Sequence, residues 1–271
     1  MGITGRYAAL VEQVKNGYEL AFSDLNKTSK IQLQLKQLDD ASDATQTVQL
    51  MESLNSSDNP IALLGGAGSD LHAAAAAVAD KNKTPYLGIA FALLSVHQQG
   101  FKYLFSPFPK SPQIAVTTFD MFDTLSPKPS KVATFHEKTD WGAELSGLWK
   151  QEAQKRGYEV VTDEEYTPGA TDYSSLILKA KGANADVLLS LPTPPDGIAL
   201  QKQLKELDYL PKMTVFIRAA DSLIWGQNLG KDGDYVLNAP GWSPQLKFPG
   251  VSQVVDEHQA AYNKSAEALV G

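Results

Sequence analysis

The sequence predicts an α/β protein of two lobes, each built around a mostly parallel sheet. Helical and strand patterns alternate along the whole chain, and its 271 residues suit two ordinary domains. A proline-containing break at residues 127–130 separates two stretches with the same rhythm. We therefore expect an N-terminal lobe over residues 1–126, a C-terminal lobe over 127–238, and a segment, 239–271, that returns to the first lobe. The same rhythm is compatible with a closed βα barrel, but the central break favours two lobes.

In the first half, apolar residues at helical spacing predict a helix over residues 7–26. Near-alternation of apolar and polar residues predicts a strand over 31–38, and a second helix, capped by Ser42 or Asp43, then runs through Leu54. The second half repeats the pattern. Its expected strands are 132–135, 158–161 extending towards 166, 186–191, 213–217 and 235–238, and its expected helices are 141–156, 171–181, 197–207 and 219–229.

Residues 61–105 contain the most informative unit of the chain. An apolar strand at 61–64 enters a glycine turn, Gly65–Gly68, and Ser69 opens an alanine-rich helix. Glycines allow close backbone approach, and the first turn of a helix offers unpaired N–H groups at the positive end of its dipole. The turn therefore suits an anion, most simply a carboxylate. Because it matches neither the dinucleotide nor the phosphate-loop spacing, a purely structural turn remains the alternative.

Composition excludes several classes of function. A net charge of -7 argues against nucleic acid or an anionic membrane as a partner. The absence of cysteine excludes disulfides, thiolate metal sites and a cysteine nucleophile. No apolar stretch reaches membrane-spanning length and the N-terminus shows no signal-peptide pattern, so we expect no membrane insertion.

No catalytic or metal-binding pattern stands out. The sequence has no G-x-S-x-G, so Ser69 is better interpreted as a helix cap that can bind a ligand. None of the four histidines has a second histidine or a glutamate at metal spacing, and Asp70 with His72 is the nearest approach to a metal pair, so we expect neither a metal nor a cofactor. His72 is expected to be solvated or to line the cleft between the lobes. The acidic clusters Asp39–Asp40 and 163–165 are expected to cap elements or to lie on the surface.

Two further positions follow predicted strands, where α/β folds bind ligands. Thr193 and Pro194 lie between a buried strand and a helix, and Arg218 follows the next strand. A lone arginine is usually a surface charge, but at a ligand site it can hold a carboxylate bidentately. Trp242 could line a ligand cleft, although packing under a loop explains it equally well.

The order of several motifs resembles one family, the branched-chain amino acid (type I) periplasmic binding proteins of ABC transporters. The resemblance covers nearly the whole chain and implies two Rossmann-like lobes, joined by a hinge, that close on a small polar ligand. The motifs that carry it are residues 4–8, 65–69, 84–86, 100–105, 168–173, 186–189 and 242–244.

The resemblance also implies a binding site. In the family, the serine after the glycine turn and the loop after the next strand bind the ligand carboxylate, and the second lobe supplies an acidic group for the ammonium. Carried over to this chain, the candidate ligand-binding residues are Gly68, Ser69, Ala90, Phe91, Ala92, Thr193, Pro194 and Arg218.

Two departures shift the expected ligand. Ala92 stands where amino acid binders tend to have a threonine, and Arg218 places a cation near the expected carboxylate, which disfavours an ammonium group. Given the aromatic residues Tyr7, Phe91 and Trp242, we expect an organic anion, such as an aromatic carboxylate, rather than leucine or valine.

A third departure concerns the ends. The family has a strand before Thr4 that is reduced here to residues 1–3, and further elements after the final helix, so the fold is expected to be truncated at both ends. An exposed sheet edge then predicts reduced stability and dimerisation through that edge.

The expected function is that of an extracytoplasmic solute-binding protein, periplasmic or extracellular. It captures an amino acid or organic carboxylate and delivers it to a membrane permease, with no nucleic acid partner and no catalysis. A ligand-sensing receptor or regulator domain of the same fold is the alternative. An α/β enzyme is disfavoured because no nucleophile, base and orienting group converge in the sequence.

Overall fold

The computed structural model describes residues 1–271. The chain forms two compact units. Unit 1 contains Met1–Phe91, Ser95–Phe108 and Pro240–Gly271, and unit 2 contains Ala92–Leu94 and Pro109–Ala239. Both units are α/β, as the sequence predicts.

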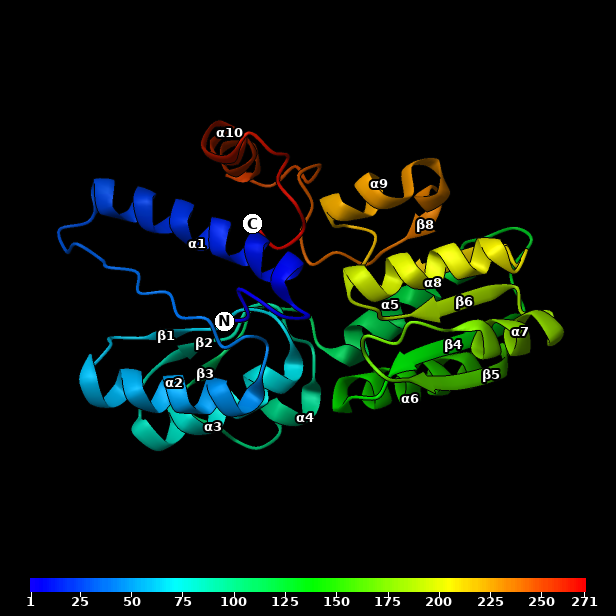
Figure 1. The fold of residues 1–271 in the computed structure, drawn as a ribbon, viewed down its shortest axis with the longest axis horizontal. Helices are drawn as coiled ribbons and strands as arrows, with labels where there is room; N and C mark the ends of the chain where they lie inside the picture. The colour runs from blue at the N-terminus through cyan, green and yellow to red at the C-terminus, as the bar shows by residue number, and fades with distance from the viewer. The chain divides into compact units, whose positions relative to one another are not determined.

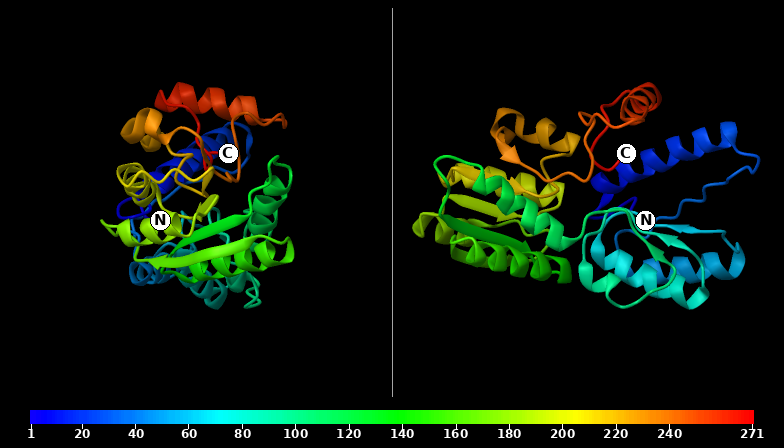
Figure 2. Two further views of the ribbon diagram at one scale, coloured as in Figure 1. Left: turned by 90° about the vertical axis from the view of Figure 1, so that its right-hand side faces the viewer. Right: turned by 180° about the vertical axis from the view of Figure 1, so that it is seen from behind.

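Unit 1 is built on a sheet of three short parallel strands in the order β1-β2-β3. Helix α1 lies on one side of these strands and helices α2 and α3 on the other (Figure 1), an arrangement seen again from behind in Figure 2. The elements are α1 (Ala8–Thr28), α2 (Ala44–Ser57), β1 (Leu63–Leu64), α3 (Ser69–Asn82), β2 (Tyr86–Leu87), the short α4 (Leu94–His97) at the unit boundary, β3 (Leu104–Phe105) and α10 (Val251–Tyr262).

The predicted strand over residues 31–38 is wrong. The segment is extended, but no backbone hydrogen bond joins it to β1, and it belongs to no sheet. The side chain of Asn26 holds it instead, accepting from the Leu33 amide at 2.7 Å and donating to the Leu33 carbonyl at 2.9 Å. An alternating pattern produces a strand only where a neighbouring strand edge is within reach, and here β1 is not.

Unit 2 has a five-stranded parallel sheet in the order β5-β4-β6-β7-β8. The order reverses between β4 and β6, because the chain places β5 on one side of β4 and the later strands on the other. The elements are α5 (Ser111–Asp123), β4 (Lys131–Glu137), α6 (Asp140–Lys155), β5 (Glu159–Tyr166), α7 (Ser174–Gly182), β6 (Val187–Ser190), α8 (Pro194–Glu206), β7 (Met213–Phe216), α9 (Leu223–Leu229), the 3-10 helix η1 (Gly230–Gly233) and β8 (Val236–Leu237).

Both faces of this sheet are covered by helices, α6 on one side and α8 on the other (Figures 1 and 2). Along β4, Ala133 and Phe135 join the core formed with α7, α8 and α9, while Thr134 donates to Asp163 on the α6 side, where Ser146 also reaches that carboxylate. A strand buried on both faces reads as a nearly continuous apolar run, and β6 is buried at all four of its residues.

Helix α5 was expected in the N-terminal lobe, which was predicted to end at residue 126. It belongs to unit 2, where it packs against α6, and the rings of Phe119 and Tyr158 meet edge to face with centroids 5.2 Å apart. The helix that packs against α5 is α6, which comes after residues 127–130 in the chain. The proline break therefore lies within unit 2 rather than between the two units. No helix of the protein is both long enough and apolar enough to cross a bilayer.

Candidate functional site

The glycine turn after β1 is held in a conformation that only glycine fits easily. Gly68 has φ +103°, and a Cβ atom there would lie 2.3 Å from the Tyr7 ring. Its amide donates to the Ala90 carbonyl at 3.3 Å, beside an isolated parallel bridge between Ala67 and Ala90. The turn is therefore tied to the loop that contains Ala90 and Phe91, and the two predicted binding segments of unit 1 lie side by side.

The ring of Tyr7 packs against Gly68 of this turn. Its hydroxyl donates to Asp70 Oδ1 at 2.8 Å, and the Arg6 guanidinium pairs with Asp70 Oδ2 at 2.5 Å while lying 4.5 Å from the centre of the Tyr7 ring. The ring is buried. These contacts fix the start of α3 and neutralise the carboxylate in its first turn.

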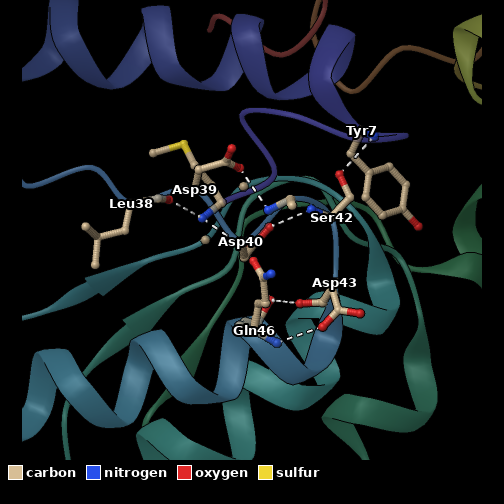
Figure 3. Close-up of polar contacts among 12 residues, drawn as sticks. Tyr7, Leu38, Asp39, Asp40, Ser42, Asp43 and Gln46 are labelled. Carbon is tan, nitrogen blue, oxygen red and sulfur yellow. Dashed lines mark hydrogen bonds and ion pairs between the residues drawn. The ribbon is translucent and has the colours of Figure 1, made fainter.

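Figure 3 shows how the start of the chain is anchored. Asp39 is exposed and accepts the amides of Thr4 and Ala41, as expected of a capping or surface residue, whereas Asp40 is not on the surface. Asp40 is buried, accepts from the Ser42 amide at 3.0 Å, and pairs with the Met1 amino group at 3.1 Å. The Tyr7 amide donates to Ser42 Oγ at 3.2 Å. This loop thus places Tyr7 against the glycine turn.

Ser69 is the first residue of α3 and is buried. The amides of the first helical turn have no carbonyl within the helix to accept them, and the helix dipole is positive at this end. Since Asp70 is already paired with Arg6, these amides and the Ser69 hydroxyl can bind an anion.

His72 is buried, which excludes the solvated position, one of the two that the sequence left open. Its Nδ1 lies 2.5 Å from the Tyr86 hydroxyl and its Nε2 lies 3.2 Å from the Gly66 carbonyl. Burial lowers the pKa of His72 to about 4, so the ring is neutral at pH 7. The Phe91 ring stacks between His72 and His97, with centroids 4.5 Å and 4.9 Å away.

In unit 2, polar side chains gather at the carboxyl ends of the strands, beside the point where strand order reverses. Glu137 ends β4 and is only 1% exposed in its side chain, and Arg218 follows β7 and pairs with it at 2.5 Å. The Arg218 guanidinium also lies 4.7 Å from the Trp141 ring, and its Nε donates to the Pro192 carbonyl at 3.4 Å. A buried carboxylate therefore already compensates the charge of Arg218.

Thr193 precedes α8, and Pro194 is the first residue of that helix. Both are buried, and the Thr193 hydroxyl donates to Asp196 Oδ2 at 3.0 Å. Asp196 Oδ1 accepts the Gly169 amide at 3.0 Å, so Asp196 ties the loop after β5 to the start of α8.

Asp221 is a candidate that the sequence patterns missed. Its Oδ1 atom is buried without a hydrogen-bond partner, and burial raises the pKa of its carboxyl to about 6, partly offset by Arg218. The Tyr166 hydroxyl and the Trp141 Nε1 atom, from the same unit, are also buried without partners. Apolar residues around Asp221 predicted a helix over 219–229, but α9 starts only at Leu223 and leaves Asp221 in the preceding turn.

The structure brings the predicted residues together in two separate sets. Ala92 belongs to unit 2, where its carbonyl accepts both the amide and the hydroxyl of Ser111 at 2.9 Å. Trp242 packs closely against Gly271 in unit 1, so closely that a Cβ atom at Gly271 would lie 2.3 Å from the tryptophan ring. That both units act on one ligand stays a prediction. The set in unit 1 is Tyr7, Gly68, Ser69, Ala90 and Phe91, and the set in unit 2 is Thr193, Pro194 and Arg218, joined by Glu137 and Asp221.

Comparison with known proteins identifies relatives along almost the whole chain. The Leu/Ile/Val-binding protein homolog 8 of Brucella abortus (strain 2308) is 26% identical over 279 residues, which cover 96% of this chain and 68% of the relative. The leucine binding protein LivK of Thermotoga maritima superposes with a TM-score of 0.91 at 20% identity, over 99% of this chain and 76% of that one.

A solute binding protein of an ABC transporter from Rhodopseudomonas palustris BisB5, solved with 3,4-dihydroxybenzoic acid, gives a TM-score of 0.84 at 17% identity, over 99% of this chain and 74% of that one. These likenesses show the type I fold of two α/β lobes, and the proteins concerned bind solutes rather than catalyse reactions. Residues 2–269 match the profile of the family described as periplasmic binding protein. The chain belongs to the periplasmic binding protein family.

Proposed function

We propose that this protein captures an α-amino acid with an aliphatic side chain outside the cytoplasm and delivers it to the permease of an ABC transporter. The names of its relatives, a Leu/Ile/Val-binding homologue and a leucine binding protein, support this ligand class. One observation carries the proposal. The buried, unpartnered carboxylate oxygen of Asp221 is suited to an ammonium group.

In this proposal, the ligand carboxylate binds in unit 1. The amides at the start of α3 and the Ser69 hydroxyl supply donors, with Gly68 allowing close approach. Phe91 and Ala90, tied to the turn through the Ala67–Ala90 bridge, supply an apolar contact for an aliphatic side chain.

The ammonium group binds to Asp221 of unit 2. Arg218 argued against an ammonium when only the sequence was considered, because it placed a cation at this position. The ion pair with Glu137 weakens that argument, since the buried carboxylate offsets the positive charge. Binding an ammonium compensates the desolvation that raises the pKa of Asp221.

An aromatic carboxylic acid is the second candidate. The stacked rings of His72, Phe91 and His97 favour it, as does the structural relative that holds 3,4-dihydroxybenzoic acid. In that case Arg218 rather than Asp221 contributes the main charged contact. A ligand-sensing role is the alternative for the same fold, and neighbouring permease and ATPase genes distinguish transport from sensing.

Native mass spectrometry of the purified protein, followed by thermal shifts with a ligand panel after partial unfolding and dialysis, tests the proposal. Leucine, isoleucine and valine are expected to raise the melting temperature, because a ligand that binds only the folded state stabilises it. Benzoate and 3,4-dihydroxybenzoate serve as competitors. A shift with the aromatic acids and none with the amino acids overturns the proposed ligand in favour of the second candidate.

A further inference from the structure

The His72 side chain is enclosed by the two predicted binding segments of unit 1. A Cβ atom at Gly65, in the glycine turn, would lie 2.2 Å from the Cε1 atom of His72. A Cβ atom at Gly88, at the start of the loop that contains Ala90, would lie 3.1 Å from its Nδ1 atom. The imidazole also stacks on the Phe91 ring of that loop, with the two planes 22° apart. The ring therefore lies between the glycine turn and the loop.

The same side chain donates to an oxygen atom that joins these two segments. The Gly66 carbonyl accepts the Ala90 amide at 3.4 Å and lies 3.2 Å from His72 Nε2. Because a carbonyl oxygen can only accept, Nε2 carries the proton of the neutral ring and donates to Gly66. The Gly68 amide, which donates to the Ala90 carbonyl at 3.3 Å, joins the segments a second time. His72 thus reinforces the backbone hydrogen bonds that hold the turn against the loop.

Tyr86 holds the ring in this tautomer. With the proton on Nε2, Nδ1 is the acceptor, and the Tyr86 hydroxyl lies 2.5 Å from it. Burial raises the pKa of Tyr86 well above its ordinary value, so the hydroxyl keeps the proton that it donates. Burial lowers the pKa of His72 to about 4, so the ring offers one donor and one acceptor at pH 7. The neutral ring in this orientation therefore matches both of its partners.

We infer that His72 is a positioning residue for the ligand carboxylate, acting through its hydrogen bond to the Gly66 carbonyl and its contact with the Phe91 ring. His72 lies in the first turn of α3, so a displaced ring shifts the turn that carries the Ser69 hydroxyl and amide. Donors bind a carboxylate well only when supporting groups hold them in the correct geometry. The inference rests on the proposed binding of a carboxylate in unit 1.

The test compares His72→Phe with His258→Phe. The first substitution keeps a ring against Phe91 but removes the donor to the Gly66 carbonyl. His258 is the matched control, because it is also buried in unit 1, with a hydrogen-bond partner at each ring nitrogen and an aromatic neighbour. Both variants are expected to lower the melting temperature, since each leaves a buried polar group without its partner.

Calorimetric titration with leucine and with leucinamide, which has a neutral amide in place of the carboxylate, measures the effect on ligand binding. The wild-type protein and His258→Phe are expected to prefer leucine by the same factor. His72→Phe is expected to bind leucine about tenfold more weakly and leucinamide with nearly unchanged affinity, because only the contacts to the carboxylate are displaced. Unchanged affinity for leucine, or an equal loss for both ligands, overturns the inference.

The same titrations separate this inference from the proposed ligand. If the wild-type protein binds 3,4-dihydroxybenzoate and no amino acid, the proposed ligand is wrong. The comparison of 3,4-dihydroxybenzoate with its amide then carries the same expectation for His72→Phe. If the wild-type protein binds leucine and leucinamide equally, the carboxylate site and the positioning role fail together, whereas the ammonium site at Asp221 is unaffected.

Amide hydrogen exchange tests the role of His72 without any ligand. Exchange at Gly68 and Ala90, whose amides join the turn to the loop, is expected to be at least tenfold faster in His72→Phe than in His258→Phe. Tyr86→Phe, which removes the donor to Nδ1, is expected to change the exchange in the same direction by a smaller factor. Equal exchange in His72→Phe and His258→Phe contradicts the positioning role.

If His72→Phe fails to fold, NMR of the histidine ring nitrogens in the wild-type protein decides the question. A proton on Nε2 of His72 alone is expected at pH 7, because the Gly66 carbonyl needs a donor and the Tyr86 hydroxyl needs an acceptor. A proton on Nδ1 overturns the inference, since the ring then makes no hydrogen bond to the glycine turn.

Discussion

The two units of this protein follow the same α/β rhythm but differ in how completely their sheets are paired. In unit 2, β4 is seven residues long, pairs on both sides, and is buried between layers of helices. In unit 1, each strand has two residues, and the edge of β1 faces a groove. The difference shows that an alternating sequence pattern gives a fully paired sheet only where another strand lies beside each edge.

Truncating one leucine in each unit, one fully buried and one half-buried, is expected to show this difference most strongly. Leu145→Ala, on α6 and fully buried in unit 2, is expected to lower the free energy of unfolding by about 3 to 5 kcal/mol, because a cavity forms in a close-packed region. Leu54→Ala, on α2 in the groove wall, is expected to cost only about 1 kcal/mol, since its side chain is already incompletely packed. Denaturant unfolding monitored for each unit measures both. Equal losses contradict the comparison.

The second prediction concerns ligand affinity in unit 2. Asp221→Asn is expected to weaken binding of a branched-chain amino acid by about 2 to 4 kcal/mol, because it removes one partner of a buried charge pair. Asp234→Asn, an exposed aspartate of the same unit, is the control and is expected to change nothing. Calorimetric titration of both variants makes the comparison. Unchanged affinity in Asp221→Asn excludes this residue from the site.

The third prediction is that acid acts on the two units in opposite directions. The pKa of Asp221 is raised to about 6, so its unfavourable ionisation is absent below the ordinary value near 4 and develops as pH rises through 6. Its contribution to the stability of unit 2 therefore increases by roughly 1 to 3 kcal/mol as pH falls from 7 to 4.

His72 responds in the opposite sense. Its pKa is lowered to about 4, so the stability that comes from keeping it neutral is present above about 6.5 and is lost as pH falls towards 4. Unit 1 is thus expected to weaken between pH 6.5 and 4 while the Asp221 contribution strengthens unit 2. Unit-resolved hydrogen exchange at pH 7 and pH 5 measures this. Asp221→Asn and His72→Gln are each expected to flatten the response of their own unit only, and a persisting response points to other groups.

The smallest expected effect lies at the support of the glycine turn. Tyr7→Phe removes the hydrogen bond to Asp70 while keeping the ring against Gly68, so a loss of about 1 kcal/mol in stability is expected. Thermal unfolding measures it, with Tyr235→Phe, at a tyrosine that is 96% exposed, as the control. A loss of stability as large as that expected for Leu145→Ala would show that the Tyr7 hydroxyl contributes more than its single hydrogen bond to Asp70.

The sequence predicted what depends on local pattern. The helices α1 and α6, the parallel strands of unit 2 and the glycine turn before Ser69 all follow from periodicity and turn chemistry. Prediction from the sequence failed where the structure depends on contacts between segments that are far apart in the chain. The Arg218–Glu137 pair joins positions 81 residues apart, and the 31–38 segment lacks a strand beside it. Asp221 was not recognised as a site residue because its neighbours predicted a helix over 219–229, whereas α9 begins only at Leu223.

Proton release on ligand binding tests the central claim most directly. At pH 6 the Asp221 carboxyl is about half protonated, and an ammonium group bound beside it lowers its pKa. Titration calorimetry with leucine in two buffers of different ionisation enthalpy is expected to show release of about half a proton per ligand bound, absent in Asp221→Asn. Proton uptake, or binding of 3,4-dihydroxybenzoate with no response to leucine, would contradict the account.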